Sequence, residues 1–228
     1  MLFLYSCATT GGIQDEQLGS INGRSGRDTK VAKAVAKTQI PEEKDFYRIP
    51  EAGPAFWTEV MTSDIAYQYR AINGVSQCTI FVADVIDEYF GEDLYSLVFP
   101  TGTKGANATF DDWIENQSLV RLSPDEYSIE EIQNLADEGY LILMAYFYAE
   151  ISGHAAFVGH SELDLFTVPP IDGLEGKSGS QMDRSYYPVM VQAGTYTGVT
   201  SMVYATNGWL RNDNFGDGIV RYYAVSNS

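Results

Sequence analysis

The sequence of 228 residues contains only two cysteines and two histidines. Two thiols can form at most one disulfide bridge, and a chain of this length can bury enough apolar surface to fold without one. We therefore expect Cys7 and Cys78 to have separate roles. The Cys-x-x-Cys and His-x-x-x-His spacings of zinc sites are absent, as are a complete phosphate loop and a calcium loop. The sequence therefore predicts no metal and no cofactor.

Basic residues are also scarce, with 14 lysines and arginines against 31 acidic residues and a formal net charge of −17. Half of the basic residues lie before Glu51, and they form no cluster in the remainder. This distribution argues against a nucleic-acid partner, because phosphate binding requires a clustered basic surface. A solvated acidic surface explains the charge most simply, and it also suits export or a cationic ligand.

No apolar run before the first cysteine is long enough to span a bilayer. The segment 1–7 is nevertheless apolar, and Leu4-Tyr5-Ser6-Cys7 resembles a bacterial lipobox. The resemblance implies that Cys7 is lipidated and that Met1 lies inside a longer signal peptide; the alternative is an incidental apolar N-terminus. On this interpretation we expect an exported protein of the bacterial cell envelope, in the periplasm or at the cell surface, that contacts the membrane only through Cys7.

The chain divides into the apolar segment 1–7, a tether over 8–50 and one globular domain over 51–228. The tether is rich in Gly, Ser, Thr and Lys and has little apolar periodicity, which is typical of a flexible linker. In the domain, helices are predicted over 56–70, 78–90, 109–117 and 129–138, the last one opened by the capping box Ser128–Glu131. Strands follow over 140–149, 154–159, 187–192, 202–205 and 219–225. Helices first and an antiparallel sheet afterwards indicate an α+β fold.

Cys78 begins one of these helices. The apolar residues Phe81, Val82 and Val85 follow it at helical spacing, so Cys78 lies on the stripe that packs inward. With Ser76 as the N-cap and Gly91 at the C-terminal end, the thiol would lie in the first turn, where the helix dipole favours a thiolate. The alternative is that Cys78 is simply a small buried hydrophobic residue.

The two histidines, His154 and His160, lie on or beside one predicted strand. Side chains alternate along a strand, so His154 should share a face with Ala156 and Val158. A nucleophilic cysteine needs a base within hydrogen-bonding reach and a third polar group that holds the base in its useful tautomer. His154 is the candidate base, while His160 is interpreted as structural or substrate-lining.

Three segments resemble one family of bacterial cell-wall hydrolases. Gln77-Cys78-Thr79-Ile80-Phe81-Val82-Ala83 is similar to the cysteine motif of CHAP domains, and Ser152-Gly153-His154-Ala155-Ala156-Phe157-Val158 is similar to the histidine strand of CHAP and NlpC-type enzymes. The segment from Ala106-Asn107 to Trp113 also resembles the family. The resemblance covers about 67–192 and implies a papain-like fold, in which the nucleophile helix packs on a C-terminal antiparallel sheet.

The resemblance also implies roles for individual residues. Cys78 would be the nucleophile, His154 the general base and then acid, and Gln192, at the end of an apolar strand, the third catalytic residue. CHAP domains more often have an acid or asparagine at the third position, so Asp164, Asp172 and His160 remain alternatives. Tyr69 and Gln77 would lie at oxyanion or substrate-binding positions, although the simpler interpretation of Tyr69 is a core tyrosine.

The expected function is therefore that of a monomeric cysteine peptidase or amidase that cleaves an amide bond of peptidoglycan. The bond would lie in the stem peptide or at the sugar–peptide junction, as in an N-acetylmuramoyl-L-alanine amidase. Two alternatives remain open. One is a catalytically inactive glycan- or peptide-binding module on the same fold, and the other is a secreted effector or acyltransferase with the same Cys–His dyad.

Overall fold

The computed structural model describes residues 7–8, 45–51, 53–69, 75–103, 106–148, 152–164, 166–167, 188–193, 197–201 and 220–227. Its helices are α1 (Pro54–Thr62), α2 (Asp64–Gln68), α3 (Cys78–Phe90), α4 (Glu92–Val98), α5 (Ala106–Glu115) and α6 (Ile129–Asp137). The single helix predicted over 56–70 is divided into α1 and α2 at Ser63. Ser63 has an extended backbone (φ −73°, ψ 164°), and its hydroxyl donates to the Val60 carbonyl at 2.6 Å, which ends α1.

The described strands are β1 (Cys7–Ala8), β2 (Val75–Ser76), β3 (Leu119–Leu122), β4 (Ile142–Tyr148), β5 (Ser152–Val158), β6 (Phe166–Thr167), β7 (Val189–Gln192), β8 (Gly198–Ser201) and β9 (Val220–Val225). Seven of them form one sheet in the order β3-β9-β4-β5-β7-β8-β6, and every pairing in it is antiparallel. The prediction of helices with an antiparallel sheet is thus confirmed. The sequence analysis missed β1, β2, β3, β6 and β8, and the strand predicted over 202–205 lies outside the described residues.

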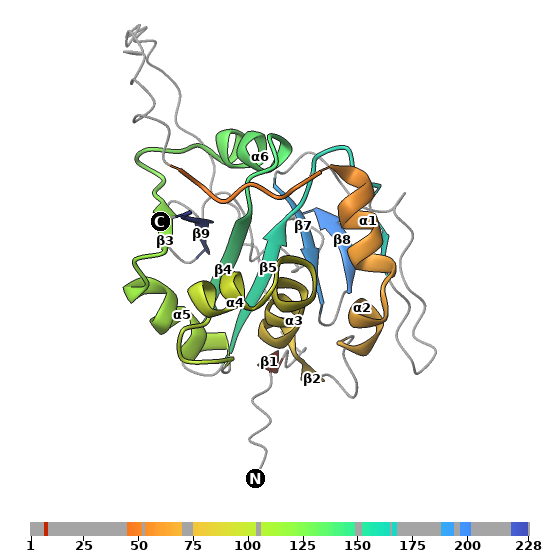
Figure 1. The fold of residues 1–228 in the computed structure, drawn as a ribbon, viewed down its shortest axis with the longest axis horizontal. Helices are drawn as coiled ribbons and strands as arrows, with labels where there is room; N and C mark the ends of the chain where they lie inside the picture. Colours follow the sequence, from red (N-terminus) through yellow and green to blue (C-terminus); the bar gives the residue numbers. More distant parts are fainter. Residues whose placement is uncertain are drawn as a thin grey trace, which may run out of the picture. The chain divides into compact units, whose positions relative to one another are not determined.

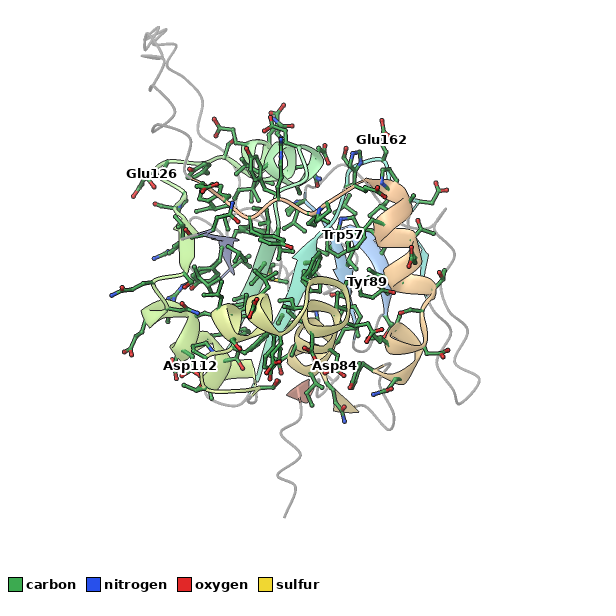
Figure 2. The ribbon with its side chains drawn as sticks, in the orientation of Figure 1. Trp57, Asp84, Tyr89, Asp112, Glu126 and Glu162 are labelled. Carbon is green, nitrogen blue, oxygen red and sulfur yellow. The ribbon has the colours of Figure 1, made fainter. Side chains whose placement is uncertain are left out.

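The two faces of the sheet pack against different helices. One face, which carries Ala155 and Phe157 of β5, packs against buried side chains of α1, α3, α4 and α5. Figure 1 shows α3 in front of β5, and the Trp57 ring of α1, labelled in Figure 2, lies 5.2 Å from the Phe157 ring. The other face, which carries Ala156 and Val158, packs against α6 through Ile132. Each strand in the centre of the sheet is therefore buried on both sides.

The capping box predicted at Ser128 is present at the start of α6. The Glu131 amide donates to Ser128 Oγ at 3.2 Å, and the Ser128 amide donates to Glu131 Oε2 at 2.7 Å. The C-terminal end of the helix is held by its last side chain, since Asp137 accepts hydrogen bonds from the backbone and hydroxyl of Ser161, each at 2.7 Å. These contacts attach α6 to the segment that follows β5.

Residues 45–50, which the sequence analysis assigned to the tether, form part of the folded unit. Phe46 and Arg48 make isolated antiparallel bridges to Ser226 and Tyr140, and the side chains of Phe46 and Ile49 are buried. The Arg48 guanidinium also lies 4.9 Å from the centre of the Tyr140 ring. Apolar burial and backbone pairing together explain why this short segment is ordered although it lacks helical or strand periodicity.

The strand β1 pairs with β2 outside the seven-stranded sheet. Cys7 is the partner of Ser76 and Ala8 that of Val75, in antiparallel orientation. The strand β1 also contacts β5, and residues 1–9 group with residues 45–228 in one compact unit. Among the described residues, no helix has the length and apolar character required to cross a membrane.

Candidate active site around Cys78 and His154

Cys78 is the first residue of α3. Gln77, not the predicted Ser76, occupies the N-cap position, and its carbonyl accepts the Phe81 amide at 2.9 Å. The reason is that Ser76 is held in β2 by pairing with Cys7, which leaves a single residue between strand and helix. At the other end, Gly91 adopts the predicted positive φ (87°), and its amide donates to the carbonyls of Ile86 and Asp87, each at 3.1 Å. The structure therefore places Cys78 in the first turn, as expected.

The Cys78 side chain is fully buried, with a relative exposure of 0%, and it is present as a thiol and not in a disulfide. It belongs to the apolar cluster between α3 and the sheet. One turn further along α3, the Phe81 ring lies 6.2 Å from the Phe157 ring of β5. The cysteine helix is thus fixed against the strand that carries His154.

His154 and Gln192 are brought together in the sheet. His154 Nε2 lies 2.6 Å from Gln192 Oε1, and the two side chains are only 7% and 2% exposed. A carbonyl oxygen can only accept a hydrogen bond, so Nε2 is the protonated ring nitrogen and Nδ1 is the accepting one. Burial lowers the pKa of His154 to about 4, while the hydrogen bond that His154 donates to Gln192 acts in the opposite direction. The ring is therefore neutral at pH 7 and held in one tautomer.

The sheet register fixes the face on which this pair lies. His154 is the Cα partner of Tyr146, which belongs to the apolar cluster that includes Met190 and Val158. Gln192 follows Met190 by two positions, so it projects from the same face. The body of α3 packs on the opposite face, where Ala155 and Phe157 lie. Cys78 and His154 therefore lie on opposite faces of the sheet, near the end where β5 begins beside the start of α3 (Figure 1).

The structure separates His154 from two of the alternative orienting residues. His160 follows β5, six residues and about 20 Å along the chain from His154. Its Nδ1 accepts the Glu162 amide at 3.1 Å and lies 3.9 Å from Asp137 Oδ1. Asp164 is exposed and lies further beyond the same end of β5. The third alternative, Asp172, lies outside the described residues. Gln192 is thus the described candidate that contacts His154.

Tyr69 and Gln77 occupy different positions relative to Cys78. The Tyr69 hydroxyl donates to Asp84 Oδ2 and accepts from Gln68 Nε2 at 2.8 Å. Asp84, labelled in Figure 2, lies six residues after Cys78, or about 9 Å along the helix axis. Burial, with the Asp84 carboxylate second, raises the pKa of Tyr69 to about 12. Tyr69 thus connects α2 to the middle of α3, whereas Gln77 is half-buried directly before the thiol.

The sequence analysis did not identify Tyr146 as part of this site. It lies directly opposite His154 on β4 and is 4% exposed, so His154 has Tyr146 on one neighbouring strand and Gln192 on the other. In the sequence, Tyr146 is one of several aromatics in an unbroken apolar run. Only the register of the β4–β5 hairpin distinguishes it from Phe147 or Tyr148.

We compared the chain with models of known protein families and with curated proteins. No match was found. In the part of the chain that the structure describes, no three His, Cys, Asp or Glu side chains gather into a metal-binding group. The chemistry of the site is therefore inferred from the thiol, the imidazole and the amide described above.

Proposed function

We propose that the protein is a cysteine-dependent hydrolase that cleaves an amide bond of bacterial peptidoglycan. The observation that carries the proposal is the 2.6 Å contact between His154 Nε2 and Gln192 Oε1. It commits one ring nitrogen to an acceptor in the sheet and leaves Nδ1 as the basic atom. A base held in a single tautomer by a polar partner is what a thiol nucleophile requires.

In the proposed reaction, His154 Nδ1 removes the proton from Cys78 Sγ, and the thiolate attacks the carbonyl carbon of the scissile amide. The first turn of α3 favours the negative charge, and its backbone N–H groups are suited to stabilise the oxyanion. The protonated imidazole then gives its proton to the leaving amine, and an acyl-enzyme remains. Water, deprotonated by the same imidazole, hydrolyses the thioester and restores the thiol.

The mechanism requires Sγ and Nδ1 to meet around the end of the sheet. Cys78 is buried on the α3 face, and His154 projects from the face of Tyr146. Cys78 is the first residue of α3 and His154 the third residue of β5, so the mechanism requires the first turn of α3 to approach the first half of β5. The papain-like arrangement of helix and sheet is proposed on the same grounds, together with the similarity to CHAP and NlpC-type motifs.

The substrate and the location are proposed from that similarity. Peptidoglycan is the substrate class of the enzymes that the two motifs resemble, and a lipid on Cys7 would keep a monomeric enzyme at the envelope. The acidic composition, with a net charge of −17, is compatible with peptides that carry free amines.

A second candidate function is a peptide- or glycan-binding module without turnover. The exposures of 0% for Cys78 and 7% for His154 favour it, because a nucleophile has to be reached by its substrate. A buried cysteine is a common core residue.

Digestion of purified sacculi tests the hydrolase proposal. Wild-type protein, Cys78→Ala and His154→Ala would be compared for the release of soluble muropeptides, with Cys7→Ala as the matched cysteine control. The proposal expects release by wild type and Cys7→Ala only. Equal release by wild type and Cys78→Ala would exclude a catalytic Cys78, and release by none of the folded proteins would favour the binding module.

A further inference from the structure

The strand β2 leads directly into the candidate nucleophile and is paired along its edge by the chain's own N-terminal segment. Only Gln77 separates Ser76 from Cys78. The pairing is antiparallel, with Cys7 opposite Ser76 and Ala8 opposite Val75. The edge of β2 therefore already binds an extended backbone in this structure.

We propose that the β2 edge is the docking strand for an extended peptide and that β1 occupies it in place of that peptide, covering Cys78. The strand β1 contacts both β2 and β5, which are the elements that carry the residues next to the thiol and the imidazole. The complete burial of Cys78 agrees with a covered site. Peptides commonly bind by adding a strand to an exposed edge, with main-chain hydrogen bonds supplying the affinity.

The register predicts where a bound peptide would lie. In an antiparallel pair, the chain opposite β2 runs towards its own N-terminus as β2 runs towards Cys78. Consider a peptide docked in the orientation of β1, with one residue opposite Ser76. The peptide residue two positions before that one would then lie opposite Cys78. The docking strand would accept any extended backbone without proline at the paired positions, because proline lacks the N–H that a ladder needs.

The pairing of β1 with β2 is short enough for a peptide to displace β1. Among the described residues, two pairs join β1 to β2. The strands β1 and β2 belong to the same chain, so their pairing is intramolecular and a free peptide has to compete with the effective concentration of β1. A peptide that pairs over more residues than two would compete with it.

The experiment measures the accessibility of Cys78 in the full chain. Either Cys7 or Ala8 directs its N–H towards β2, so Cys7→Pro and Ala8→Pro are both made, with Cys7→Ser and Ala8→Ser as matched controls that keep the N–H. Alkylation by iodoacetamide is followed at Cys78 by peptide mapping, which separates it from Cys7. At least one proline variant should be alkylated about tenfold faster than its serine control, because local opening governs access to a covered site. Rates within twofold of the controls for both proline variants would overturn the proposal.

A second measurement tests docking from solution. A hexapeptide with the sequence of residues 5–10, with serine in place of the cysteine, is added to the more reactive proline variant. It should slow the alkylation of Cys78, whereas the same peptide N-methylated at its third and fourth residues should not. Equal protection by both peptides, or by neither, would overturn docking at the β2 edge. The inference rests on the proposed function only in so far as Cys78 is taken to be the nucleophile. Because alkylation requires no turnover, sacculus digestion can fail while these results hold, and the two failures are distinguishable.

Discussion

Gln192 Oε1 on β7 accepts a hydrogen bond from His154 Nε2 on β5 across 2.6 Å. Both strands contact α3, the helix that begins with Cys78. Replacement of Gln192 by leucine keeps the approximate volume and removes the acceptor. Because that hydrogen bond raises the pKa of His154, the variant should have a pKa below the present value of about 4. Loss of the fixed tautomer should lower kcat for muropeptide release about 100-fold, the contribution of a well-placed general base.

The tautomer itself is the direct readout of the Gln192 substitution. In wild type, the ¹⁵N shifts of His154 should show a protonated Nε2 and an unprotonated Nδ1, with His160→Ala used to assign the two histidines. Gln192→Glu, which still accepts from Nε2, is the matched control and should keep this tautomer. An unchanged tautomer in Gln192→Leu would show that the amide does not orient the ring.

Burial of His154 makes the stability of the protein depend on pH. The pKa of this histidine is about 4 in the folded state and about 6.5 when unfolded, so the unfolded state binds the proton more readily between these values. The stabilisation is fully present above pH 6.5 and is lost as the pH falls towards 4, by about 3 kcal/mol in total. Between pH 7 and pH 5, urea unfolding of wild type should lose about 2 kcal/mol more than unfolding of His154→Leu. The same loss in both proteins would assign the pH dependence to other groups.

Gln133 makes three hydrogen bonds, one within α6, one to the residue that follows β5 and one to the first residue of β7. Its Nε2 donates to Asp137 Oδ1 at 2.8 Å and to the Gly159 carbonyl at 2.9 Å, and its Oε1 accepts the Val189 amide at 2.8 Å. Gln133→Leu leaves two buried backbone groups without this partner, which should cost about 3 kcal/mol. The free energy of unfolding in urea measures the cost. The exposed Gln117, replaced by leucine in the same way, should change the stability by less than about 0.5 kcal/mol.

Gly159 lies where the chain leaves β5, in space that is already filled. A Cβ at this position would lie 2.8 Å from Val191 Cγ2 and 2.9 Å from Leu163 Cδ1. Gly159→Ala should therefore destabilise the protein by about 1–3 kcal/mol through overpacking. At Gly53 no atom lies within 4 Å of such a Cβ, so Gly53→Ala is the control for the loss of a glycine. Equal midpoints of thermal unfolding for the two variants would contradict a packing effect at Gly159.

The periodic and capped parts of the fold were predicted from sequence, whereas features that depend on pairing were not. The helix from Cys78 to Phe90, the capping box at Ser128 and the antiparallel β4–β5 hairpin follow from local patterns. The division of the first helix coincides with the hydrogen bond from the Ser63 hydroxyl to Val60, and α4 (Glu92–Val98) packs against α3; the sequence analysis anticipated neither. The short strands β1 and β2 exist only because they pair with each other, and two residues carry no period.

For the site, the alternation of side chains correctly placed His154 with Ala156 and Val158. Alternation along one strand does not reveal which face the helices cover, so the position of α3 on the opposite face became apparent only in three dimensions. The sequence limited the residue that orients His154 to four candidates, namely Gln192, Asp164, Asp172 and His160. The choice of Gln192 depends on β7 lying next to β5, which is a long-range pairing. Roles for Cys78, His154, Gln192, Tyr69, Gln77 and Cys7 in catalysis, binding or lipidation stay predictions.

The β1–β2 pairing also determines the distance between a lipid on Cys7 and the active site of the proposed enzyme. Cys7 lies opposite Ser76, and such partners have Cα atoms about 5 Å apart. The strands β1 and β2 belong to one compact unit, so an acyl chain on Cys7 would lie close to Cys78. If the proposed enzyme were anchored through Cys7, it would act only on wall material that touches the membrane surface. Release of β1 would separate Cys7 from Ser76, so the docking of a peptide on β2 would at the same time release a lipid-bearing Cys7 from the neighbourhood of Cys78.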